Sequence, residues 1–277
     1  MSEKKLRAER ARAFRELHRE GSMLVLPNVW DAGSARVVES CGATAVATSS
    51  AAVAWAHGTL DGERVGREAL VRLVADIARA VRVPVTVDAE QGYAEGPGGV
   101  ADTVAALVHA GAVGINLEDG AGPPEALARK IEVAKRAGGA AGVDLFVNAR
   151  TDVYLRGLVP PDRAASEVLR RARLYREAGV DGLFVPGLSA PAEIEVVARE
   201  AGLPLNVMIV PGLAPAAELK RLGVRRLSAG TALAQATLGF VRQAARELLE
   251  RGTYASLFAD PLPYGELNEL FARSPAG

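Results

Sequence analysis

Residues 83–99 read VPVTVDAEQGYAEGPGG. An apolar, β-branched run ends in Asp88 and Glu90, and turn-forming residues follow at once. Side chains at positions i and i+2 of a strand point to the same side, so both carboxylates are expected on one face of the strand end. Two like charges this close need a positive partner. The stretch therefore predicts a buried strand that ends at a polar site.

Seven further runs of this kind recur along the chain. Each is rich in Val, Ile or Leu with little alternation, as expected for parallel strands that are covered on both faces. Amphipathic segments separate the runs, and a glycine that can end a helix often precedes the next run. The eight runs span 23–29, 44–50, 83–90, 113–119, 144–151, 181–187, 203–209 and 224–230.

Eight strands that alternate with helices predict an α/β fold, a (β/α)8 TIM barrel, in preference to an open doubly wound sheet. No GxGxxG follows an early strand, which weakens a dinucleotide-binding alternative. No linker-like change of composition occurs, so residues 1–277 are predicted to form one domain. Residues 231–277 exceed what a barrel needs, and we expect this C-terminal helical extension to pack against a neighbouring subunit.

Composition excludes several classes of protein. The 33 basic and 33 acidic residues balance, which argues against a nucleic-acid partner or a polybasic membrane surface. No signal peptide or membrane span is expected, because no sufficiently long apolar run is present. The single Cys41, expected to be packed at a helix end, predicts a reducing and cytoplasmic location. The charged N-terminal run with Leu6, Phe14 and Leu17 predicts a surface helix.

Polar residues at the ends of the predicted strands are the candidate site, because barrel active sites lie at the C-terminal ends of strands. Asp88, Glu90 and Glu118 converge there with no adjacent Lys, so they are expected to share a cation. Oxygen ligands suit Mg²⁺, with Mn²⁺ as the alternative. Asp31 and Asp119 fit equally well as members of this site or as residues that cap the following helices and solvate loops.

Arg150 ends the fifth strand and offers a planar fork for a substrate carboxylate or phosphonate. Ser49 and Ser50 end the second strand and could bind the same anionic group. A metal and an arginine clamp fit a small 2-oxo acid whose enolate the metal stabilises. His57 is the candidate acid–base group, and a place on the loop surface is its alternative.

Five motifs in this order resemble the isocitrate lyase and phosphoenolpyruvate mutase superfamily: SSAAVAWAHGTLDG (49–62), VDAEQGY (87–93), GINLED (114–119), NARTD (148–152) and LNVM (205–208). The resemblance implies a barrel whose last helix is exchanged between subunits, in a homotetramer of such dimers. It also implies Mg²⁺ near Asp88, with metal-bound waters on Glu90, Glu118 and the catalytic Asp61. The implied substrate-binding residues are Trp30, Ser49, Ser50, Ala51, Asp88, Arg150 and Asn206.

One stretch departs from the resemblance. Members that cleave isocitrate carry a K-[KR]-C-G-H loop after the fourth strand, where this chain has EDGAGPPEALARK (118–130) without Cys or His. Three functions therefore stay open. The first is a Mg-dependent C–C lyase or oxaloacetate-type hydrolase that acts on a 2-oxo or 2-hydroxy acid. The second is a phosphonopyruvate hydrolase or phosphoenolpyruvate mutase-like enzyme, and the third is a non-catalytic, metal-dependent 2-oxo acid binding protein.

Overall fold

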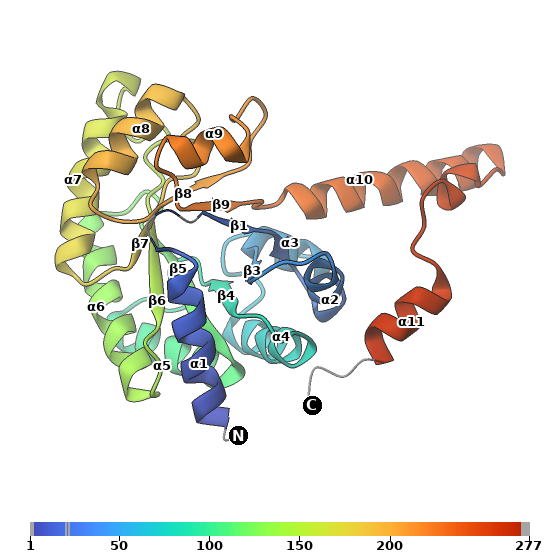
Figure 1. Cartoon of the computed structure of the whole chain (residues 1–277), viewed down its shortest axis with the longest axis horizontal. Helices are drawn as coiled ribbons and strands as arrows, with labels where there is room; N and C mark the ends of the chain where they lie inside the picture. Colours follow the sequence, from blue (N-terminus) through green and yellow to red (C-terminus); the bar gives the residue numbers. More distant parts are fainter. Residues whose placement is uncertain (1–2, 20, 22, 273–277) are drawn as a thin grey trace.

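The computed structural model describes residues 3–19, 21 and 23–272, and its parallel strands form one sheet that curves into a nearly closed barrel (Figure 1). Strands β1 (Leu24–Leu26) and β2 (Asn28–Val29) stand at the two ends of the strand order. β1 pairs with β9 (Arg226–Ser228), and β2 pairs with β3 (Val46–Thr48). Only Pro27, which has no N–H to give to a ladder, separates β1 from β2. They are thus two halves of one strand, and the predicted (β/α)8 barrel is confirmed.

Each of the eight predicted runs coincides with a strand, or with β1 and β2 in the first run, and most strands are shorter than the run; β5 begins one residue before its run. Parallel pairing continues around the barrel in sequence order, from β3 to β9. The polar ends of the strands consequently meet at one rim. The remaining strands are β4 (Val85–Asp88), β5 (Ala112–Glu118), β6 (Phe146–Arg150), β7 (Gly182–Phe184) and β8 (Leu205–Met208).

Helices surround the barrel and bury the apolar faces that the sequence pattern predicts. Four of them begin with Pro in the first turn, where a missing N–H costs no helical hydrogen bond. These helices are α2 (Ala32–Ser40), α3 (Ser50–Ala56), α4 (Arg67–Ala80), α5 (Pro97–Ala110), α6 (Pro124–Ala140), α7 (Pro161–Glu177), α8 (Pro191–Glu200) and α9 (Ala216–Arg221). Among the described residues, no helix is both long and apolar enough to cross a membrane.

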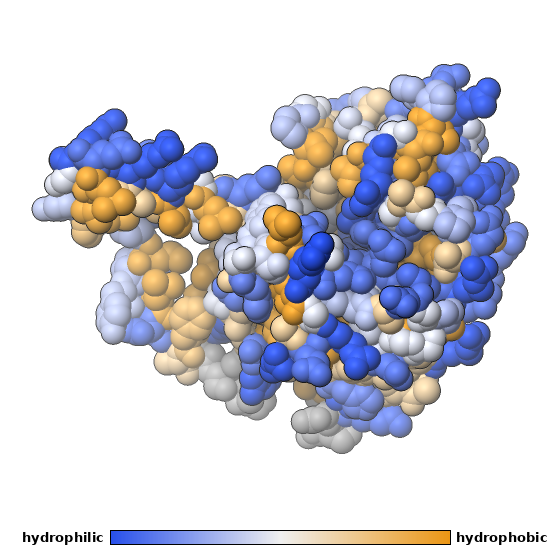
Figure 2. Space-filling view, turned by 180° about the vertical axis from the view of Figure 1, so that it is seen from behind, coloured by the Kyte–Doolittle hydropathy of each residue, from blue (hydrophilic) through white to orange (hydrophobic). Residues whose placement is uncertain are grey.

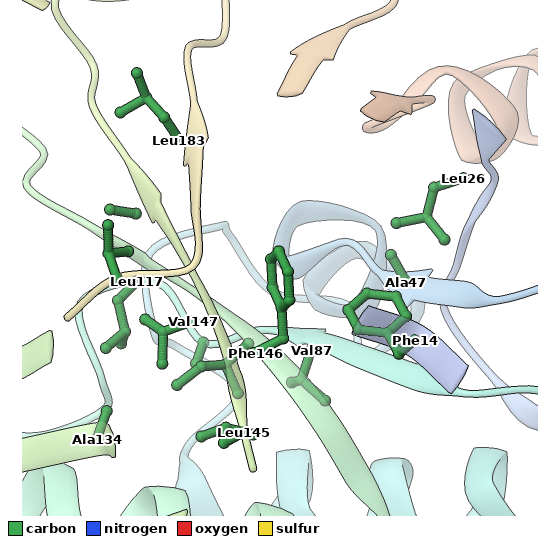
Figure 3. Packing of buried hydrophobic residues seen from close by; sticks show 14 of the residues in the cluster. Phe14, Leu26, Ala47, Val87, Leu117, Ala134, Leu145, Phe146, Val147 and Leu183 are labelled. Carbon is green, nitrogen blue, oxygen red and sulfur yellow. The ribbon is translucent and has the colours of Figure 1, made fainter. Parts of the chain in front are cut away.

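Helix α1 (Glu3–Glu16) closes the barrel at the amino ends of the strands, so the prediction of a simple surface helix is wrong for its apolar face. Phe14 is fully buried and meets the first residue of β6, Phe146, edge to face at 5.4 Å (Figure 3). His18 stacks on Phe146 at 4.2 Å, and burial lowers the pKa of His18 to about 3. The expectation for Cys41 is also wrong, because its thiol is exposed rather than packed.

Substitution of Gly114 by Ala is expected to lower the free energy of unfolding by about 1–3 kcal/mol, because overpacking a dense core forces side chains aside. A Cβ atom at Gly114 would lie 2.8 Å from Phe14 Cε1 and 2.8 Å from Thr86 Oγ1. Urea denaturation checks this result. Gly139→Ala is the control: Gly139 lies exposed within α6 with nothing near its Cβ position, so that change should be neutral or stabilising. Equal effects of the two changes would contradict the packing explanation.

Helix α10 (Ala232–Arg246) leaves the barrel as an arm that ends in the π-turn Glu247–Arg251 (Figure 1). A 3-10 turn (Ala255–Phe258) and α11 (Tyr264–Ala272) follow, and α11 returns to α2, where Arg36 Nη2 donates to the Leu270 carbonyl at 2.6 Å. The middle residue of β1, Val25, is 50% exposed. Within the part of the chain that the structure describes, the outer face of β1 at Val25 is thus left half open.

Candidate active site

Two adjoining cavities open at the carboxyl ends of the strands, with volumes of about 160 Å³ and 240 Å³. Ser50, Asp61 and Arg150 line both. The first cavity also contains the predicted residues Ser49, Ala51 and Asp88, and the second contains Glu90 and Glu118. The structure therefore brings together eight residues that the sequence placed in one site.

Asp88 ends β4 with one carboxylate oxygen engaged and one free. Its Oδ2 accepts a hydrogen bond from the Ser50 backbone N–H at 3.2 Å, and its own N–H donates to Thr48 Oγ1 at 2.9 Å. Asp88 Oδ1 is buried and has no hydrogen-bond partner among the described residues. A buried, unpaired carboxylate oxygen is costly, so this atom is well suited to a cation or a donor that arrives with a ligand.

Glu90 does not share the strand face of Asp88, which corrects the expectation drawn from the i, i+2 spacing. β4 ends at Asp88, and Glu90 adopts the left-handed conformation with φ 46°. Its carboxylate accepts hydrogen bonds from the Glu63 backbone N–H, at 3.0 and 2.9 Å, and from the Tyr93 hydroxyl at 2.8 Å. Glu63 accepts in return from the Tyr93 N–H at 2.7 Å. This network ties the loop that carries Asp61 to the loop after β4.

Burial raises the pKa of Glu90 to about 7, although Tyr93 and Glu63 oppose the rise. The folded protein therefore holds a proton on Glu90 that the unfolded chain, with an ordinary pKa of about 4.3, releases. Because the folded state then binds more protons, this group lowers stability as the pH rises from about 4.5 to 7.

In metal-free protein, the free energy of unfolding of Glu90→Gln is compared with that of the wild type at pH 5 and pH 7.5. We expect the difference to change by roughly 2 kcal/mol in favour of the variant as the pH rises, since one pKa unit is worth about 1.4 kcal/mol. Urea denaturation of both proteins in a chelator at the two pH values measures the difference, in which other groups such as His18 cancel. The exposed Glu95→Gln should show no such change. A constant difference between Glu90→Gln and the wild type would contradict the raised pKa.

Arg150 is the positive group among these acids. Its Nη1 lies 2.8 Å from Glu118 Oε2, while its Nε and Nη2 donate to the two oxygens of the buried Asp152 at 2.7 and 3.2 Å. Burial raises the pKa of Glu118, Arg150 opposes this rise, and Asp88 adds to it. The guanidinium group is thus fixed in place by two carboxylates at the mouth of the barrel.

Asp31 and Asp119 are structural. Asp31 caps α2 by accepting from the Ser34 N–H at 2.6 Å. Asp119 accepts from Arg171 at 2.7 Å, from the Tyr175 hydroxyl at 2.5 Å and from the Asp152 N–H at 3.0 Å. Both residues therefore fill the capping and loop-supporting roles that the sequence left open.

Three predicted residues line neither cavity. His57 is exposed at the C-terminal cap of α3, and its Nδ1 donates to the Val53 carbonyl at 2.9 Å. Asn206 lies inside the barrel, where it accepts from Asn148 at 3.1 Å and donates to Ser228 at 3.1 Å. Trp30 is partly buried at the end of the first strand, outside both linings.

Sequence reasoning missed other lining residues. Asn116 stands two positions before Glu118 on β5, and the period of two could have revealed it. Glu63 and Leu155 lie in loops, where no periodicity signals a direction. Phe184 and Met208 have the apolar side chains of ordinary strand residues, yet both reach the first cavity.

The fit of a metal ion can be tested on the side chains themselves. In residues 3–19, 21 and 23–272, no group of three or more Asp, Glu, His or Cys side chains is arranged to hold a metal directly. Mg²⁺, however, keeps several waters and commonly binds through one or two carboxylates. The free Asp88 Oδ1, with Glu90, Glu118 and Asp61 around the same mouth, fits a hydrated Mg²⁺ rather than a closed cage.

Fold and site together define a (β/α)8-barrel protein with an acidic mouth built around one fixed arginine. The sequence profile described as Phosphoenolpyruvate phosphomutase matches residues 14–249, and the chain belongs to this family. The resemblance drawn from the five motifs is thereby confirmed, and the members of this superfamily are lyases, hydrolases and mutases.

Individual relatives extend this finding. The chain is 32% identical over 275 residues to an oxaloacetate decarboxylase of Bradyrhizobium sp. (strain BTAi1), covering 95% of this chain and 93% of that protein. A candidate lyase/mutase from Burkholderia cenocepacia J2315 superposes with a TM-score of 0.90 at 37% identity, covering 98% and 99% of the two chains. Phosphonopyruvate hydrolase, solved with oxalate and Mg²⁺, shares the fold with a TM-score of 0.81 at 22% identity, over 94% of each chain.

Proposed function

We propose that the protein is a Mg²⁺-dependent enzyme that breaks a C–C bond in a small 2-oxo or 2-hydroxy acid through an enolate. The observation that carries this proposal is that Arg150 and Asp88, whose Oδ1 has no partner among the described residues, line the same small cavity. A guanidinium group suits a substrate carboxylate, and a carboxylate oxygen suits the metal. The names lyase/mutase and oxaloacetate decarboxylase among the relatives support the same chemistry.

The proposed roles follow from position. Asp88, with Glu90 and Glu118 through water, holds Mg²⁺, which when bound supplies Lewis-acid stabilisation of enolate charge. Arg150 binds the substrate carboxylate, assisted by Ser49, Ser50 and Ala51 at the start of α3, where helical N–H groups lack partners within the helix. Asp61 lines both cavities and is better placed than the exposed His57 to accept or return a proton.

A panel of acids followed by proton and phosphorus NMR tests the proposal. Oxaloacetate, dimethylmalate, methylisocitrate, phosphonopyruvate and 4-hydroxy-2-oxopentanoate are each incubated with Mg²⁺ and with a chelator. Metal-dependent release of pyruvate or another small acid supports a C–C enzyme. Phosphate release from phosphonopyruvate would establish the P–C alternative instead. Metal-dependent binding of a 2-oxo acid without turnover would favour a binding protein.

We further propose that α10 and α11 pack on a second copy of this chain, as the resemblance to the superfamily implies. Apolar side chains are exposed along the arm (Figure 2), among them Leu238, Phe240 and Val241. A patch of this kind on a protruding helix is typical of an association surface. The exposed Val25 on β1 supports the proposal, because the described residues leave this point of the barrel wall open to a helix of another copy.

Light scattering of the full chain is expected to give a dimer or tetramer of the 28.9 kDa chain. Val241→Glu should shift the mass toward the monomer, because it places a charge at a half-exposed apolar position of the arm. Gln243→Glu adds the same charge at an exposed polar position of α10 and should leave the mass unchanged. A monomeric wild-type protein would refute the exchange.

A further inference from the structure

The first cavity has an apolar wall. Leu155, Phe184, Pro186 and Met208 line it together with the polar residues described above. Phe184 is 6% exposed and lies under the Arg150 guanidinium, 6.0 Å from it, whereas Leu155 is 48% exposed at the mouth. A substrate whose carboxylate is held by Arg150 therefore has hydrocarbon side chains among its nearest neighbours.

The positive charge of the site is already committed. Of the described residues that line the first cavity, Arg150 alone is cationic, and it contacts both Glu118 and Asp152. The second cavity adds Arg156, whose Nε donates to Asp152 at 2.8 Å. Against these two guanidinium groups stand five lining carboxylates: Asp61, Glu63, Asp88, Glu90 and Glu118.

A divalent cation and one substrate carboxylate add a single net positive charge to this set. Acids therefore still outnumber cations, and a second anionic group on the substrate would enter without a partner, which is costly in a buried site. The stretch from Gly120 to Pro124, which leads from β5 into α6, contains no Lys or Arg. Apart from Arg150 and Arg156, which already bind carboxylates of the protein, the described lining thus holds no Arg or Lys that could recognise a second carboxylate or a phosphonate.

The cavity is also small. Its volume of about 160 Å³ is close to that of an apolar cavity of about 150 Å³ that binds benzene, a molecule of six heavy atoms. A pyruvate-like fragment fills most of such a space. Within this first cavity, only a short substituent on C3, the carbon next to the 2-oxo carbon, can then lie against the apolar wall. The adjoining cavity of about 240 Å³ has no such wall, because mainly polar residues, many of them acidic, line it.

We infer that the substrate carries a short, uncharged substituent on C3, rather than a second carboxylate or a phosphonate. This inference rests on the proposed function and narrows its substrate class. A 4-hydroxy-2-oxo acid meets the requirement. Loss of the 4-hydroxyl proton to a base and breakage of the C3–C4 bond release a neutral aldehyde, and the bonding pair forms the pyruvate enolate. Protonation of that enolate at C3 gives pyruvate, so no further reactant is needed.

Calorimetric titration of the full chain, in the presence of Mg²⁺, tests the inference. The two titrants are malate and 2-hydroxy-4-methylpentanoate, which are stable and of similar size. In 2-hydroxy-4-methylpentanoate, an isopropyl group replaces the C4 carboxylate of malate. We expect the branched acid to bind at least tenfold more tightly than malate. Leu155→Lys, at a half-exposed position that tolerates a charge, should reverse or abolish the preference, whereas Leu155→Met should keep it.

Oxalate, which has no C3 substituent, separates the two proposals. If oxalate binds in the presence of Mg²⁺ and malate binds as tightly as the branched acid or more tightly, the inference is overturned while the proposed function stands. If oxalate does not bind, the proposed function fails and the inference fails with it. Tighter binding of the branched acid together with a reversed preference in Leu155→Lys supports both.

Discussion

Asp88→Asn is expected to lower kcat/KM on the substrate that the panel identifies by about 10³-fold, a loss of roughly 4 kcal/mol of transition-state stabilisation. The change removes the negative charge of the carboxylate whose free Oδ1 is the atom best placed for the metal. It keeps an oxygen that can accept the Ser50 N–H, so the turn into α3 should remain intact. Activity at several Mg²⁺ concentrations measures the loss of kcat/KM. Calorimetry with Mn²⁺ measures the loss of metal affinity that should accompany it.

The matched control is Asp102→Asn, since Asp102 is exposed on α5, away from the strand ends. It should keep full activity and full metal affinity. If Asp88→Asn retains Mn²⁺ affinity and turnover, the metal is held elsewhere and the assigned role of Asp88 is wrong. Unchanged thermal stability of both variants would show that the loss is chemical rather than structural.

Asp119→Ala is expected to lower the free energy of unfolding by about 3–5 kcal/mol, the largest stability effect we predict. The carboxylate is buried and serves three donors, and its removal leaves the Arg171 charge, the Tyr175 hydroxyl and the Asp152 N–H without it. The cost arises mainly from leaving buried donors without an acceptor, since Arg171 then keeps only its ion pair with Glu167. Urea denaturation followed by circular dichroism measures it.

Asp76→Ala is the comparison for that change. Asp76 also pairs with an arginine, Arg79, but both side chains are exposed on α4. Exposed pairs of this kind contribute at most about 1 kcal/mol. A loss of similar size in the two variants would mean that burial of the Asp119 network does not set its contribution.

Most of the barrel could be predicted from the sequence, because its strands are short apolar runs, most of them with polar residues at one end, and Gly-terminated helices lie between many of them. The break at Pro27 left the first strand recognisable as one run, since both halves keep the same pattern. The surplus of residues 231–277 predicted an extension that packs on a neighbouring subunit, but not the direction in which α10 leaves the barrel, because an amphipathic helix packs equally well on its own barrel or on a partner. Composition likewise gave no sign that Phe14 closes the barrel floor.

The candidate site was predictable wherever strand geometry fixes a residue, as at Asp88, Glu118 and Arg150. It was not predictable where loops decide. Glu90 turns away from its strand through a positive φ, and Glu63 reaches it from a distant loop. Such contacts depend on tertiary closure of the loops, which leaves no periodic pattern in the sequence. His57 and Asn206 illustrate the converse, since both lie near the rim in sequence but face other surroundings.

The residues at the base of the arm both line the first cavity and lead into α10. Gly230 and Thr231 line the first cavity, Gly230 donates to Asn28 Oδ1 at 2.8 Å, and α10 begins at the next residue, Ala232. A ligand in the cavity and a partner that binds the arm would thus both contact the chain close to this segment. By reciprocity, a ligand that tightens association must itself bind more tightly to the associated form. Ligand affinity would then depend on protein concentration, and the dissociation constant of the assembly would report on occupancy of the cavity.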